Sequence, residues 1–87
     1  MDLNEIRQDI DNTDRKLVDL FCRRMALAAK VASYKKEHNM EIFVPEREQQ
    51  ILISAAEQAG PEMADYVRRL YQTLFELSRD YQAEVLK

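Results

Sequence analysis

The chain has 87 residues, of which 46% are apolar and 33% are charged. This length and composition suit one small globular domain over residues 1–87, with no room for a second. Thirteen basic and sixteen acidic residues give a net charge of −3, which disfavours nucleic acid binding because that activity needs a basic surface. No run approaches the roughly 18 apolar residues of a membrane helix, and the N-terminal stretch is acidic, unlike a signal peptide. We therefore expect a cytoplasmic protein.

The sequence contains one cysteine, Cys22, and one histidine, His38. A lone cysteine excludes an internal disulfide and a Cys-based zinc site, and it suits a reducing compartment. We expect neither a bound metal nor a cofactor.

Strong helix breakers are few, because the chain has one glycine and two prolines. Breaks at 39–44 and at Gly60-Pro61 leave three segments, at 3–38, 45–59 and 62–86. Apolar residues in the first and third segments recur at the three-or-four spacing of an amphipathic helix. The sequence therefore predicts an all-α fold with one long, one short and one medium helix.

Residues at the segment ends support these boundaries. Asp2 with Glu5 resembles a capping box at the first helix, and Asn39 can end that helix in the left-handed conformation. Pro45 occupies a plausible first position of the second helix, followed by Glu46 where the helix dipole favours an acid.

The length of the first helix indicates a dimer. A helix of about 35 residues is roughly 50 Å long, which exceeds the diameter of a compact 87-residue globule. The other two helices, of about 22 and 37 Å, leave part of its apolar stripe uncovered. A second copy covers it most economically, so we predict an intertwined homodimeric helical bundle. The alternative, a straight two-chain coiled coil, is disfavoured by the unequal helix lengths.

Two cations lie on the apolar face of the first helix. At 100° per residue from Leu17, Arg24 lies about −20° away and Lys35 near 0°. They are three turns apart, about 16 Å along the axis, and their long side chains can reach a shared site between them. This spacing suits an extended anion.

A simpler interpretation is that each cation reaches solvent or pairs with a buried acid such as Glu48. The ligand hypothesis gains support from other donors on the inner faces. Arg47 precedes Glu48 in the second helix, while Ser78 and Gln82 are four residues apart on the third. An excess of inward-facing donors indicates an anionic ligand.

Arg7 lies about 80° from the stripe centre and roughly 25 Å along the axis from Arg24. It is too far to serve the same pocket of its own chain. In a dimer with crossed long helices, Arg7 can reach the partner's pocket. The alternative for Arg7 is an ordinary surface charge.

Three stretches in order, IRQDIDNTDRKLVDLFCRRMALAAKVASYKK, VPEREQQIL and YVRRLYQTLFELSRDYQ, resemble the all-α chorismate mutases of the AroQ type. The resemblance covers nearly the whole chain. It implies an intertwined helical dimer with two active sites, and the Claisen rearrangement of chorismate to prephenate in phenylalanine and tyrosine biosynthesis. This concerted reaction needs no nucleophile, metal or proton transfer.

The resemblance also implies roles for individual residues. Arg24 and the partner's Arg7 would bind the substrate carboxylates, assisted by Ser78. Lys35 and Gln82 would donate hydrogen bonds to the ether oxygen of the breaking bond.

Three residues around the start of the second helix complete the implied site. Glu48 would accept a hydrogen bond from the ring hydroxyl, and Arg47 would orient Glu48 and add positive potential. Val44 stands where many family members have aspartate, so a side-chain cap worth about 1 kcal/mol is absent. Any ligand contact from Val44 must come from its backbone N–H.

Two other functions are compatible with the same sequence. An isochorismate pyruvate lyase has a similar fold and a similar cationic pocket. A non-catalytic helical dimerisation module would use its inward cations only to pair with acids.

Overall fold

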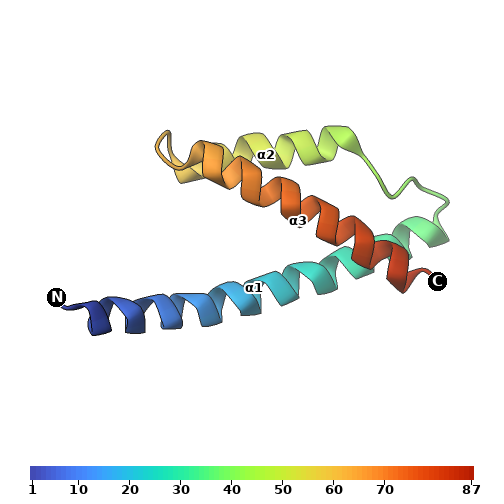
Figure 1. Cartoon of the computed structure of the whole chain (residues 1–87). Helices are drawn as coiled ribbons and strands as arrows, with labels where there is room; N and C mark the ends of the chain where they lie inside the picture. Colours follow the sequence, from blue (N-terminus) through green and yellow to red (C-terminus); the bar gives the residue numbers. More distant parts are fainter.

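The computed structural model describes residues 1–87 and confirms the all-α prediction. It contains three helices and no strand (Figure 1), namely α1 (Leu3–Glu37), α2 (Pro45–Ala59) and α3 (Ala64–Val85). The predicted boundaries agree within two residues. The largest difference is at the start of α3, because residues 61–63 form a turn rather than helix.

Both ends of α1 are defined by local hydrogen bonds. Asp2 Oδ1 accepts from the Glu5 N–H at 2.9 Å, which satisfies one free donor of the first turn. At the other end Asn39 has φ 55°, and the N–H of Met40 bonds to the Lys35 carbonyl at 2.8 Å. This is the left-handed helix end that Asn39 predicted. The chain therefore turns just beyond Lys35, which brings the following loop back toward that side chain.

The three helices form an open arrangement in which α3 contacts both α1 and α2. Helices α2 and α3 make an antiparallel hairpin, and α3 runs in the same direction as the C-terminal half of α1 (Figure 1). Ala32, Ala56 and Phe75 are the buried apolar residues. Two of these three residues are alanines, and α1 is joined to α3 by hydrogen bonds from Arg24 to Ser78 and from Gln82 to the Ala28 carbonyl.

The N-terminal half of α1 extends away from the other helices (Figure 1). The radius of gyration is 16.0 Å, whereas a compact 87-residue domain would have about 12 Å. Large apolar residues stay exposed on this half and along α3, among them Leu3, Ile10, Leu17, Leu20, Tyr66, Leu70 and Leu77. One chain thus lacks the surface to cover its own apolar stripes.

None of the helices combines the length and the apolarity that crossing a membrane requires.

Candidate active site

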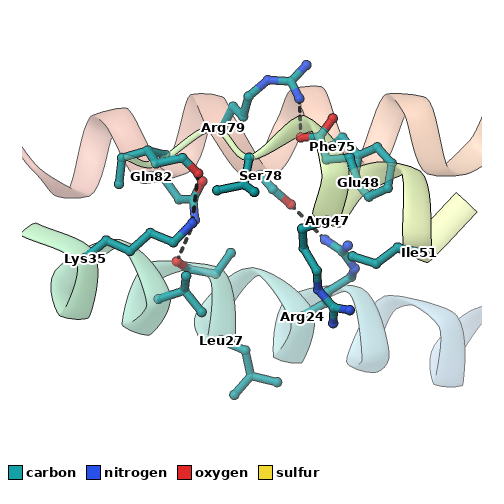
Figure 2. A pocket seen from close by; sticks show the side chains of 14 residues that line it. Arg24, Leu27, Lys35, Arg47, Glu48, Ile51, Phe75, Ser78, Arg79 and Gln82 are labelled. Atoms are coloured by element: carbon teal, nitrogen blue, oxygen red, sulfur yellow. Dashed lines mark hydrogen bonds and ion pairs between the residues drawn. The ribbon is translucent and has the colours of Figure 1, made fainter. Parts of the chain in front are cut away.

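A cavity of about 320 Å³ lies among the C-terminal half of α1, the start of α2 and the C-terminal half of α3. It brings together seven of the eight residues predicted for the ligand site (Figure 2), namely Arg24, Lys35, Val44, Arg47, Glu48, Ser78 and Gln82. Arg7 does not line it. Arg7 lies 17 residues before Arg24 on one continuous helix, and the helical rise separates the two by roughly 25 Å.

The lining of the cavity is strongly cationic. It contains four cationic side chains and one carboxylate, a formal charge of +3, although the whole chain carries −3. Seven of the fourteen lining residues are apolar, which lowers the local dielectric and strengthens the field. The cavity therefore suits a small anion with an apolar body.

Arg24 is held from α3 by neutral groups. Its Nη1 donates to Ser78 Oγ at 2.8 Å, and its guanidinium carbon lies 5.9 and 5.8 Å from the ring centroids of Tyr71 and Phe75. The Ser78 hydroxyl donates only to the sulfur of Met25, at 3.9 Å, which is a weak acceptor. Both the charge of Arg24 and the proton of Ser78 are thus available to an anionic ligand.

Lys35 also lacks an acidic partner. Its Nζ donates to the carbonyl oxygen of Ile42, in the loop after α1, at 3.1 Å. An ammonium group has three donors, so this bond leaves two for a ligand. The interpretation that Arg24 and Lys35 pair with a buried acid such as Glu48 is therefore wrong, because none of the three ion pairs in the structure involves either cation.

Gln82 is 8% exposed and donates from Nε2 to the Ala28 carbonyl oxygen at 3.0 Å. A carbonyl oxygen only accepts, so the amide nitrogen must be the atom that faces it. The second N–H of the same nitrogen is left for the cavity. Figure 2 shows Lys35 and Gln82 reaching the same end of the pocket from α1 and α3, where they can donate to one ligand atom.

Glu48 has a partner that the sequence did not reveal. Arg79 of α3 makes an ion pair with Glu48 Oε2, and Arg79 itself lines the cavity. Arg47, which was expected to orient Glu48, forms no ion pair and is exposed. The spacing of Arg79 in the sequence could have indicated its position. It lies three residues before Gln82, so the two side chains share one flank of the third helix.

Val44 lines the cavity beside the first turn of α2 and makes no side-chain cap, as predicted from the missing aspartate. Its carbonyl oxygen accepts from the N–H groups of Arg47 and Glu48, at 3.1 and 3.3 Å. The first turn of α2 therefore begins on backbone hydrogen bonds without a side-chain cap.

Comparison with known proteins agrees with this geometry. The family model "Chorismate mutase type II" matches residues 6–83. The T-protein of Haemophilus influenzae is 39% identical over 61 residues, and that of Enterobacter agglomerans is 38% identical over 58 residues. Each of these two matches covers 67% of this chain.

A third relative is the bifunctional chorismate mutase/prephenate dehydratase of Aquifex aeolicus, 38% identical over 50 residues, or 58% of this chain. No solved structure matches the chain. The matched segments span only 16%, 16% and 14% of the three relatives' own lengths. With a family model that covers most of its length, this chain belongs to the chorismate mutase type II family.

Proposed function

We propose that this chain catalyses the Claisen rearrangement of chorismate to prephenate in the biosynthesis of phenylalanine and tyrosine. The observation that carries the proposal is a single cavity in which Arg24 and Lys35 are hydrogen-bonded only to neutral groups. Two uncompensated cations in one pocket suit an anionic substrate, one to bind a carboxylate and one to meet charge that develops during the reaction. Membership of the chorismate mutase type II family supports the same reaction.

In this proposal Arg24 and Ser78 bind one substrate carboxylate. A planar guanidinium can hold a carboxylate through two parallel hydrogen bonds, and Ser78 can turn its proton from Met25 to the same group. This clamp keeps the enolpyruvyl group folded over the ring, with the reacting carbons close together. Holding the reactive conformation removes entropy from the barrier.

Lys35 and Gln82 stabilise the transition state. As the C–O bond stretches, negative charge grows on the ether oxygen, and donors aimed at that oxygen bind it more tightly than in the ground state. The Ala28 carbonyl and the Ile42 carbonyl hold these two donors in place before substrate arrives. Little reorganisation is then needed during the reaction.

Three residues complete the proposed site. Oε2 of Glu48 is taken by an ion pair, while Oε1 is free to accept from the ring hydroxyl of the substrate. Arg47 adds positive potential, and the Val44 backbone N–H is the one group of that residue able to donate to a ligand.

We further propose that the active unit is a homodimer in which Arg7 acts in trans. The chain exposes 7223 Å², whereas a compact protein of 10.3 kDa would expose about 5,400 Å². The excess, about 1,800 Å² on each chain, has the size of the surface that an obligate dimer buries. Crossed α1 helices would bring Arg7 to the other chain's cavity.

The same proposal treats residues 1–87 as one domain, since all three helices line the cavity. We also propose that the protein is cytoplasmic, because its one cysteine, Cys22, is an exposed free thiol and a reducing compartment keeps such thiols reduced.

Turnover of chorismate and of isochorismate, measured separately on purified protein with products identified by NMR, tests the proposal. We expect prephenate from chorismate, and its loss in Arg24→Ala. Pyruvate from isochorismate with little prephenate would show a lyase instead. No turnover of either substrate would leave a non-catalytic helical dimerisation module.

A further inference from the structure

Arg79 connects three parts of the cavity wall. It belongs to α3, its guanidinium pairs with Glu48 on α2, and the same guanidinium lies 4.9 Å from the ring centroid of Phe43 in the loop between α1 and α2. Figure 2 shows Arg79 reaching across to Glu48 from the opposite side of the pocket to Arg24. The Arg79 and Glu48 side chains are 37% and 26% exposed, so solvent screens their attraction only in part.

The ion pair determines what Glu48 can do. Glu48 is the one acid among the lining residues, and three other cations line the same cavity. Without Arg79, the carboxylate would be drawn toward Arg24, Lys35 or Arg47, and it would neutralise a group needed for an anionic ligand. With Arg79 present, Oε2 is occupied and Oε1 makes no hydrogen bond to the protein.

The contact with Phe43 in turn orients Arg79. A guanidinium over an aromatic face gains a cation–π interaction that favours one plane of the group. The neighbouring loop residue, Ile42, is bonded through its carbonyl to Lys35. A lysine at position 79 would keep the charge but would lose the planar stacking and the fixed direction of the donors.

From this geometry we propose that Arg79 is a positioning residue that acts through Glu48 and determines the preference for a substrate bearing a ring hydroxyl. This inference rests on the proposed chorismate rearrangement. It predicts that the effect of Arg79 depends on the presence of both Glu48 and the substrate hydroxyl.

The test is a double-mutant cycle of Arg79→Gln, Glu48→Gln and both together, assayed on chorismate and on an analogue whose ring hydroxyl is replaced by hydrogen. We expect Arg79→Gln to lower kcat/KM for chorismate about 5- to 10-fold, the effect of a partly screened charged hydrogen bond. The loss should be less than twofold on the analogue or in the Glu48→Gln background. Arg79→Lys should restore part of the activity on chorismate.

A matched control is Arg68→Gln, which removes an exposed ion pair with Asp65 on the same helix and does not line the cavity. It should leave kcat/KM unchanged. Equal losses on both substrates, or an undiminished loss in the Glu48→Gln background, would overturn the role of Arg79 while leaving the proposed function intact. Absence of turnover by the unmodified chain would overturn both. Thermal unfolding of each variant shows whether a loss of activity comes from misfolding. If Arg79→Gln misfolds, Arg79→Lys replaces it in the double-mutant cycle.

Discussion

Gln82 on α3 donates its side-chain amide to the main-chain carbonyl of Ala28 on α1, with 3.0 Å between Nε2 and the oxygen. The two residues are 54 positions apart in the sequence. Because Gln82 is 8% exposed, this bond is shielded from water and holds the amide in one orientation. One hydrogen bond between helices thus fixes the orientation of the amide that we propose as a donor to the substrate's ether oxygen.

The pH dependence of kcat in a Gln82→Glu variant tests whether Gln82 acts as a hydrogen-bond donor. We expect Gln82→Glu to lose about 10²- to 10³-fold in kcat at pH 7, as for other single donors to a developing oxyanion. An ionised carboxylate cannot donate and is repelled by the Ala28 carbonyl. Its protonated form can donate, so the variant's activity should rise as the pH falls toward the pKa of the new carboxyl, about 4.3 for an exposed glutamate and higher when buried.

The control for this measurement is the unmodified chain, since an amide does not titrate. Its activity should not require acidic pH. If the pH profiles of kcat for the variant and the unmodified chain have the same shape, the donor role of Gln82 is wrong.

Lys35 and Ser78 should differ in which kinetic constant they affect. Lys35→Ala removes a donor that strengthens as charge develops, so we expect a loss of about 3–4 kcal/mol expressed mainly in kcat. Ser78→Ala removes a hydrogen bond to a carboxylate that is charged throughout the reaction, worth about 1.5–3 kcal/mol and expressed mainly in KM. Steady-state kinetics of both variants decide this, and comparable decreases in kcat would contradict the proposed roles.

The trans role of Arg7 can be tested by mixing two inactive variants. Arg7→Ala and Arg24→Ala homodimers each lack one arginine in every site. After unfolding and refolding together, a heterodimer would contain one intact site and one site lacking both arginines. With random pairing, about one quarter of all sites should be active. No gain in activity, with heterodimers demonstrated by mass spectrometry, would exclude Arg7 from the partner's site.

Packing around the C-terminal half of α1 should be sensitive at Ala32, which is 0% exposed. Ala32→Leu adds three carbon atoms to a filled contact, and we expect a destabilisation of about 1–3 kcal/mol. Ala26→Leu is the matched control, because Ala26 is exposed on the same helix and leucine is nearly as good a helix former. Denaturation at equal protein concentration compares the two, and equal midpoints would contradict the close packing at Ala32.

Local chemistry in the sequence was sufficient to predict the helices. Asn39 and Gly60 lie where α1 and α2 end and Pro45 begins α2, and their backbone preferences act without distant contacts. The helical repeat likewise placed Arg24 and Lys35 on one face, and both line one cavity.

The partners of these side chains required the folded chain. The repeat of 3.6 residues sets a direction around each helix axis, but it does not set how far apart two axes lie or which rotamers meet between them. For this reason Glu48 was expected beside its neighbour Arg47, whereas it pairs with Arg79, 31 residues away. Similarly, Arg24 and Lys35 meet a hydroxyl and a carbonyl rather than an acid. The packing of α3 against the other two helices decides the partners of Arg24, Glu48 and Gln82, because only that packing brings groups from separate helices within reach. The partner of Lys35 is set by the turn after α1, which returns the Ile42 carbonyl to the lysine.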